Sequence, residues 1–225
     1  MHTPSLTRLL LAASSIALLC ACGGNEPAPA EPVVDAAPPE PKIDDGMPKL
    51  KCPDEATYTA TQTGQGIEQA CDIAGIRHGG FRLWHDPTTK AVEGEYDMGQ
   101  PHGDWTWRYP NGSKKSMGKY RTGKQIGGWM WWHENGNPAE EGDFLDGRKA
   151  GIWTLKYPSA SVQESGLYHN GGKSGRWVYR RDDGENTIAR VETWQNGGLT
   201  STEYFDALGK KVDGPPTPSG SSADK

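Results

Sequence analysis

The sequence has few of the residues that build an aliphatic core. Hydrophobic residues make up 34 % of its 225 residues, phenylalanine occurs only three times, and the mean hydropathy is −0.76. These values exclude a large aliphatic core. Glycine and tryptophan are abundant instead, with 30 glycines and nine tryptophans that all lie between Trp84 and Trp194. We therefore expect a core of indole rings held by glycine-rich turns.

An excess of positive charge is also missing. The formal net charge is −5 and the isoelectric point is about 5.7, so the composition gives no support to a nucleic-acid partner. The apolar run Leu9–Leu19 has eleven residues, whereas a helix that spans a bilayer takes about 20. This run follows Arg8 and has the proportions of a signal-peptide core.

The run ends in Leu19-Cys20-Ala21-Cys22, which resembles the bacterial lipobox. The resemblance implies that residues 1–21 are a lipoprotein signal peptide and that Cys22 is acylated as the new N-terminus. It also implies a lipid-anchored protein of the bacterial cell envelope, and Gly23 after the lipidated cysteine favours the outer membrane. The alternative is an ordinary secretory peptide with incidental cysteines.

Two further segments lack the residues needed to fold. Residues 22–51 hold seven prolines and six acidic residues but no aromatic residue, so we expect a disordered linker. As polyproline II it reaches about 90 Å, enough to lift a domain clear of a membrane. Residues 213–225, rich in proline and serine, are expected to form a disordered tail.

Two cysteines, Cys52 and Cys71, remain outside the signal region. In an exported protein this pair indicates a structural disulfide, which closes an N-terminal cap over residues 52–76. A redox pair or a metal site is the alternative, but there is no C-x-x-C motif and no histidine near enough in sequence to complete a metal site.

Residues 77–212 form a repeat domain in which glycines and aromatic residues recur every 24 residues. The first of these glycines are Gly79 and Gly103, each followed two positions later by a large ring, and the fifth unit carries a two-residue insertion. A period of 24 is that of a repeat architecture and is too short for a propeller blade, which takes about 40 residues. The repeated positions are Gly79, Gly103, Gly127, Gly151 and Gly175; Phe81, Trp105, Trp129, Trp153 and Trp177; Gly94, Gly118, Gly142 and Gly166; and Tyr96, Tyr120, Phe144 and Tyr168.

Each unit predicts a β-hairpin. Residues 105–109 alternate aromatic and polar side chains, and Asn111-Gly112 follows as a two-residue turn with both residues at positive φ. This turn sets Trp105 opposite Gly118 and Gly103 opposite Tyr120, so that each large ring covers a glycine on the neighbouring strand. Asp146-Gly147 and Asn170-Gly171 reverse the chain again. The fold class is therefore all-β, an antiparallel meander of about five 24-residue hairpins.

The pattern His-Gly-x-Trp, then Asn-Gly, Gly-x-Tyr and x-Gly resembles the MORN-variant repeat of bacterial YwqK-type proteins, over about residues 77–199. Members of this family are commonly labelled antitoxin components of toxin–antitoxin systems. The resemblance implies a single-layer, curved β-sheet that serves as an interaction surface and has no catalytic residues.

Catalysis, metal binding and cofactors are not expected. His78 and His102 occupy the same place in successive units, about 9.6 Å apart at 4.8 Å per strand, which is too far for a shared metal ion. No G-x-S-x-G motif is present. We therefore expect a protein that is not an enzyme.

One row of side chains on the face opposite the tryptophans is a candidate binding row; the alternative is that these side chains only cover that face. Residues 77–199 hold 17 basic and 15 acidic residues, so this row is not a strong charged patch. We expect a protein-interaction scaffold with an envelope protein as partner; the alternative is a module that binds cell wall or polysaccharide. The row consists of Trp84, Arg108, Trp132, Lys156 and Arg180.

Overall fold

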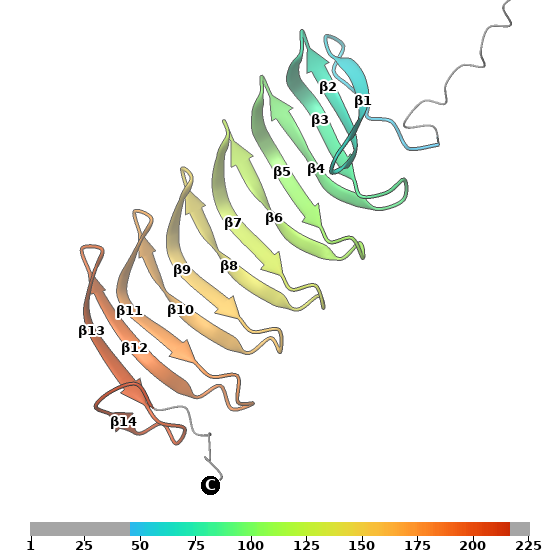
Figure 1. The fold of residues 1–225 in the computed structure, drawn as a ribbon. Coiled ribbons are helices and arrows are strands. Elements are labelled where there is room, and N and C mark those ends of the chain that lie inside the picture. The colour runs from blue at the N-terminus through green and yellow to red at the C-terminus, as the bar shows by residue number, and fades with distance from the viewer. Residues whose placement is uncertain (1–45, 217–225) are drawn as a thin grey trace, which may run out of the picture. The chain divides into compact units, whose positions relative to one another are not determined.

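The computed structural model describes residues 46–216, and all of its strands belong to one sheet. Fourteen strands follow one another in sequence order, each antiparallel to its neighbours (Figure 1). The predicted all-β antiparallel meander is confirmed, and the sheet is open and uncurled because its first and last strands do not pair. The signal peptide, Cys22, most of the linker and the end of the tail lie outside the described residues.

The strands are seven to nine residues long apart from the last, which has two. In chain order they are β1 (Thr57–Thr63), β2 (Gly66–Ile73), β3 (Ile76–Trp84), β4 (Lys90–Asp97), β5 (Gln100–Arg108), β6 (Lys114–Arg121), β7 (Lys124–Trp132), β8 (Pro138–Leu145), β9 (Arg148–Lys156), β10 (Val162–His169), β11 (Gly172–Arg180), β12 (Ile188–Gln195), β13 (Gly198–Phe205) and β14 (Lys211–Val212).

Two kinds of turn alternate along the sheet. At one end the turns hold two residues, both at positive φ, as at Asp146-Gly147 (53° and 82°) and Asn170-Gly171 (52° and 86°). This is the geometry of the type I′ turn, whose twist matches that of the strands. The predicted reversals at these two positions are confirmed.

At the other end the predicted two-residue turn at Asn111-Gly112 is wrong. Gly112 has a φ of 82°, but Asn111 is not at positive φ. Tyr109 N donates to Ser113 O at 2.9 Å, and Gly112 N donates to Tyr109 O at 2.8 Å, so the loop holds three residues. The fixed φ of Pro110 suits the first corner of such a loop, but the same loop forms at His133–Asn137 with Glu134 in that place, so proline is not required.

The strand register is nevertheless as predicted, with Trp105 opposite Gly118 and Gly103 opposite Tyr120. The longer loop alone shifts the pairing by one residue, since Arg108 lies opposite Lys114. A bulge at Lys115 then restores it.

The rings cover different glycines from those predicted. A Cβ built on Gly118 would lie 2.2 Å from the ring of Trp129, and one on Gly94 would lie 2.3 Å from the ring of Trp105. Each tryptophan thus covers the glycine of the strand before it, not of the strand after it. The reason is a bulge in the odd-numbered strands, where three residues (103–105) stand opposite Gly94 alone.

The core consists of aromatic rings on one face of the sheet. Trp105 and Trp129 are 4 % and 2 % exposed, and Trp153 and Trp177 are fully buried. Neighbouring rings from Phe81 to Trp153 lie 5.4–5.8 Å apart between centroids with their planes roughly parallel. Each buried indole N–H donates to a carbonyl of the preceding strand, at 3.0–3.3 Å. These bonds satisfy the polar atom of an otherwise apolar ring.

Side chains at the three-residue turns connect successive units. The hydroxyl of Tyr109 donates to Trp132 O at 2.8 Å, and that of Tyr157 donates to Arg180 O at 2.9 Å. Between them, His133 Nε2 lies 2.9 Å from Lys156 O. The same position in consecutive units therefore bonds to the backbone of the next unit.

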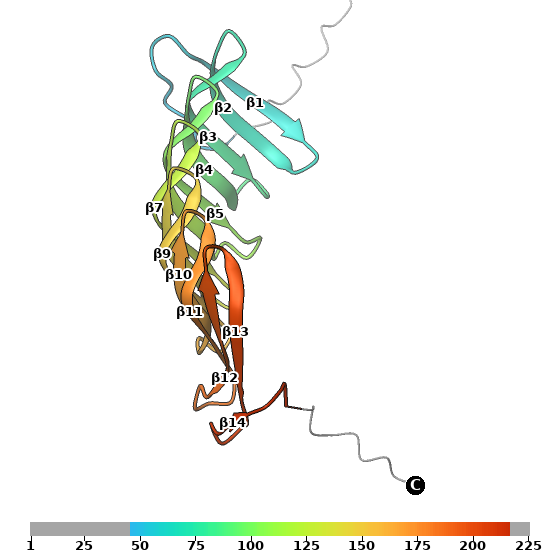
Figure 2. The same cartoon turned by 90° about the vertical axis from the view of Figure 1, so that its left-hand side faces the viewer.

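The disulfide between Cys52 and Cys71 is confirmed, with a Cα–Cα distance of 5.5 Å. It fixes residues 46–56 against β2 and β3, where Met47 is buried and Pro48 O accepts a hydrogen bond from Arg82 at 3.1 Å. The predicted cap belongs to the same sheet, because β2 pairs with β3, although β1 and β2 turn away from the later strands (Figure 2).

Candidate functional site

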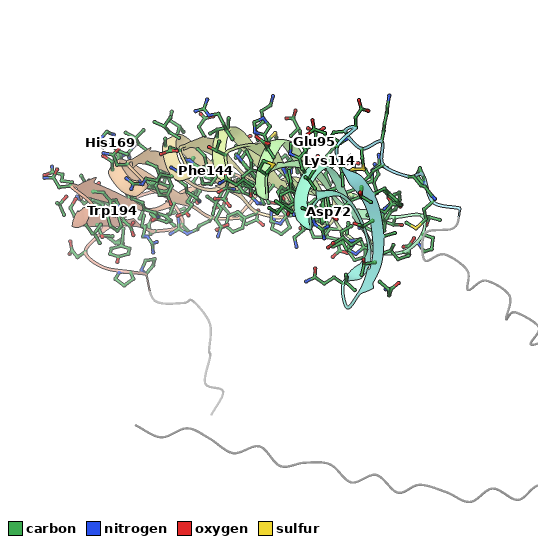
Figure 3. All side chains as sticks on the ribbon, turned by 90° about the horizontal axis from the view of Figure 1, so that it is seen from above. Asp72, Glu95, Lys114, Phe144, His169 and Trp194 are labelled. Atoms are coloured by element: carbon green, nitrogen blue, oxygen red, sulfur yellow. A yellow bond between two sulfur atoms is a disulfide. The ribbon has the colours of Figure 1, made fainter. Side chains whose placement is uncertain are left out.

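The single sheet has two faces, and both carry side chains (Figure 3). The aromatic face holds the tryptophan core and is marked in Figure 3 by Trp194. The outer face is the opposite one, marked by Glu95 and His169. On the outer face Arg82 lies opposite Glu93 and Asp104 lies opposite Lys119, the latter pair with 3.5 Å between charged atoms.

The tryptophans of the predicted binding row differ in exposure. Trp84 is 4 % exposed, and its indole N–H donates to the buried Gln69 at 3.0 Å. Trp84 is therefore buried beside β2 and presents almost no surface. Trp132, at the end of β7, is partly exposed, and Lys114 Nζ lies 5.7 Å from the centroid of its ring.

The cations of the row all have partners within the sheet. Arg108 lies 3.8 Å from Glu93, and Lys156 lies 3.2 Å from Glu141. Arg180 donates to the carbonyl of Asn186 at 3.3 Å. Such exposed pairs contribute little to stability, so these side chains are able to exchange their partners for those of a bound molecule.

An apolar strip beside this row was not predicted from the sequence. Ile152 and Leu167 lie opposite each other on β9 and β10 and are 72 % and 42 % exposed. Two shallow hollows lie along the strip, one of about 360 Å³ at Met117 and Met130 and one of about 290 Å³ at Ile152, Leu167 and Val178. We use the name apolar strip for Met117, Met130, Ile152, Leu167 and Val178. Glu141 and Thr154 lie between the two methionines and the other three residues, so the apolar strip consists of two separate patches. The patch at Ile152 is the more exposed, and an exposed apolar patch marks an interaction site.

The aromatic face is covered differently in different units. Lys149 Nζ lies 3.8 Å above the ring of Trp153 and 2.5 Å from Glu140. Lys173 lies 4.0 Å above Trp177 and 3.4 Å from Glu164. The fourth and fifth units therefore place a cation and its carboxylate over each buried ring.

In the second and third units uncharged residues take these places. Pro101 and Val92 flank Trp105, and Gln125 and Ser116 flank Trp129. Pro101 and Gln125 stand 48 and 24 residues before Lys149, and Val92 and Ser116 stand 48 and 24 residues before Glu140. Here the outer layer consists of Trp107 and Trp131, both partly exposed and both stacked on the buried rings.

Tyrosines on the aromatic face are kept protonated. Burial raises the pKa of Tyr96 and of Tyr120, with smaller effects from charged or tyrosine neighbours. Their hydroxyls therefore remain neutral over the physiological pH range.

The histidines take part in the structure of the sheet. His85 Nε2 and His133 Nε2 lie 3.2 Å and 2.9 Å from carbonyls of the next unit. In residues 46–216 no group of three or more histidine, cysteine, aspartate or glutamate side chains is placed to hold a metal ion. The same range contains no helix of the length and apolarity that crossing a bilayer requires.

No protein-family model matches the chain, and no curated protein matches it. Among solved structures, it is similar to a mutant of S. aureus TarM in complex with fondaparinux, α-GlcNAc-glycerol and UDP, at 7 % identity and a TM-score of 0.21. The match covers 65 % of this chain and 21 % of that one. A likeness at this level carries no argument about fold or function.

Proposed function

We propose that this protein is a non-enzymatic, lipid-anchored protein of the bacterial envelope that binds a protein partner through the outer face of its sheet. In this proposal Cys22 carries the lipid, the linker spans outward from the membrane, and the outer membrane is the site of anchoring. The family resemblance to MORN-variant, YwqK-type antitoxin proteins supports an interaction role and needs no catalytic group.

The observation that carries the proposal is the exposed pair Ile152 and Leu167. A Leu and an Ile side by side on an open sheet face lose solvent-exposed apolar area when a partner covers them, which contributes about 25 cal/mol per Å². Trp132 and the cations Arg108, Lys156 and Arg180 border the strip. An apolar centre with a charged, aromatic margin is the usual anatomy of a protein interface.

The test is affinity capture from envelope extract with the purified protein, quantified by mass spectrometry. Ile152→Asp is expected to lower capture of the partner at least tenfold because it places a charge in the apolar centre. Leu208→Asp is the matched control, since Leu208 is 93 % exposed in a turn beyond the strip and its change is expected to leave capture intact.

A second pair of variants separates the two faces. Trp132→Ala is expected to weaken capture while the melting temperature stays within a few degrees of wild type, whereas Trp131→Ala is expected to lower stability by about 3 kcal/mol because its ring stacks on Trp129. Equal capture by wild type, Ile152→Asp and Trp132→Ala would overturn the proposal. If the protein sedimented with purified cell wall and captured no protein partner, the polysaccharide alternative would be favoured.

A further inference from the structure

We propose that the aromatic face of the second and third units binds a neutral saccharide chain, with a sugar ring stacked on Trp107. This site is separate from the protein-binding outer face and lies on the other side of the sheet. The proposal rests on what distinguishes these two units from their neighbours.

The first observation is the missing charge. In the other units the ring at this repeat position has a cation close to its face: Arg77 lies 5.9 Å from the partly buried Phe81, Lys149 3.8 Å from Trp153 and Lys173 4.0 Å from Trp177. Each of these cations also pairs with a carboxylate. These units therefore show how the repeat covers an aromatic ring on a surface that faces only solvent, with a cation and its paired carboxylate.

The second observation is the pair of indoles that takes the place of those charges. Trp107 and Trp131 stand at equivalent places two strands apart, which is about 9.6 Å. Trp107 stacks on Trp105 with an interplanar angle of 27°, and Trp131 stacks on Trp129 with 28°. Trp107 also contacts Trp129, with 5.7 Å between centroids, which fixes its indole between the two buried rings. Glu140, paired with Lys149, lies directly opposite Trp131, so the surface without charge is the one at Trp107.

The third observation is a hollow of about 290 Å³ beside Trp107. Trp105, Trp107 and Tyr120 supply aromatic surface, Leu83, Val92 and Pro101 supply the apolar sides, and Gln65 from the β1–β2 turn supplies an amide at the rim. No lining residue carries a formal charge, since burial keeps the Tyr96 and Tyr120 hydroxyls protonated. The volume is close to the lower end of the range for small-molecule sites.

These features favour a sugar over a peptide. The C–H groups on one face of a pyranose ring are weakly positive and complement the negative face of an indole, while its hydroxyls stay at the rim in water. The amide groups of a peptide bound on this surface would lose their hydrogen bonds to water. The backbone groups of these strands could not replace those bonds, because they already pair between strands. A charged polymer would find no counter-charge among the lining residues.

The test uses isothermal titration calorimetry with the purified protein and three neutral hexasaccharides: β-1,4-linked glucose, β-1,4-linked N-acetylglucosamine and α-1,4-linked glucose. At least one is expected to bind, with Trp107→Leu lowering the affinity at least tenfold and Trp131→Leu lowering it less, because Trp131 stands beside the Glu140–Lys149 pair. Leucine is tolerated at this position in the fold, because Leu83 and Leu155 occupy it in the first and fourth units. Trp194→Leu, elsewhere on the aromatic face, is the matched control and is expected to leave affinity unchanged.

A double variant converts the site into the covered form. Ser116→Glu with Gln125→Lys reproduces the Glu140–Lys149 pair of the next unit over Trp129, and is expected to keep the melting temperature while abolishing saccharide binding. Ile152→Asp, which tests the outer face, is expected to bind saccharide normally, so the two proposals fail separately. Absence of binding by all three saccharides at about 10 mM, retained affinity in Trp107→Leu, or binding of a proline-rich peptide instead would overturn the inference.

Discussion

At the residue scale, the repeated glycines serve two different purposes. Gly118 lies beneath the ring of Trp129, where a Cβ would come within 2.2 Å of ring atoms. Gly127 has open space around its Cβ position but a φ of +62°. The first position needs the absence of a side chain and the second needs left-handed backbone, so only the first is explained by ring cover.

This difference predicts distinct responses to substitution. Gly118→Val is expected to lower stability by about 1–3 kcal/mol, because Trp129 must move away. Gly127→Ala is expected to cost about 1 kcal/mol through its backbone alone, and Gly127→Asn less, because asparagine tolerates the left-handed region. Thermal unfolding of each variant measures these effects.

Gly214→Val is the control, since nothing lies within 4 Å of Gly214 and its φ is not in the left-handed region. Wild-type stability is expected for it. If Gly118→Val melted at the same temperature as this control, the assigned packing of Trp129 on Gly118 would be incorrect.

Glu192 occupies a glycine position of the repeat at which the following strand supplies no covering tryptophan. It occupies the place of Gly166 in the fifth unit, but whereas Gly166 lies under the ring of Trp177 from the following strand, Glu192 has Thr202 opposite it on the following strand, β13. The space is filled by its carboxylate, which is 8 % exposed and accepts hydrogen bonds from Tyr179 at 2.6 Å and from the Trp194 indole at 3.1 Å.

The raised pKa of Tyr179 predicts that the protein loses stability at alkaline pH. Burial and then the hydrogen bond to Glu192 raise the pKa of Tyr179 above its usual value of 10. Because the folded state favours the neutral phenol, this contribution is fully present below pH 10 and is lost as the pH rises above it. Unfolding free energies measured from pH 8 to pH 11 are expected to fall, and Tyr179→Phe is expected to fall less steeply, so that the two curves converge. Parallel curves would contradict the assignment.

At the element scale, each hairpin depends on its neighbours. Strand pairing, the indole-to-carbonyl bonds and the Tyr109, His133 and Tyr157 bonds all join one unit to the next. Nothing in residues 46–216 brings distant units together, since the strands are paired in strict chain order. Stability is therefore expected to be a sum over units and their interfaces, as in other repeat proteins.

The disulfide is the exception, because it ties residues 46–56 onto the start of the sheet. Cys52→Ala with Cys71→Ala is expected to lower the free energy of unfolding by about 3 kcal/mol, the value for a loop of roughly 20 residues. Hydrogen exchange is the measurement, and protection is expected to be lost first in β1 and β2. Uniform loss over all strands would show instead that the sheet unfolds as one unit.

At the scale of the whole molecule, the proposed anchor decides where both faces are displayed. Cys22→Ser is expected to leave an unprocessed precursor that no longer incorporates labelled fatty acid, because only a cysteine thiol accepts the lipid. Cys20→Ser is the matched control and is expected to label normally. Labelling of Cys22→Ser but not of Cys20→Ser would place the lipid on the other cysteine.

The sequence alone determined the meander, the disulfide and the strand register. Glycines and rings with a period of 24 leave few other ways to bury indoles in a chain with so little aliphatic residue. At Asn111-Gly112 the predicted register is correct although two features of the hairpin were missed. The three-residue loop shifts the pairing by one residue and the Lys115 bulge shifts it back, and a pattern of residue spacing shows neither.

Only the tertiary structure decided which surfaces are exposed. Sequence alternation placed Trp84 in a binding row, but its side chain is 4 % exposed and its indole N–H donates to the buried Gln69 of the preceding strand. The hairpin register already sets Ile152 opposite Leu167, in the places of Asp104 and Lys119 of the second unit, but it does not show that these two apolar side chains are 72 % and 42 % exposed. The physical reason is that exposure depends on what packs against a side chain from other strands and segments, and a 24-residue period specifies each strand's own pattern but not the contents of the space above it.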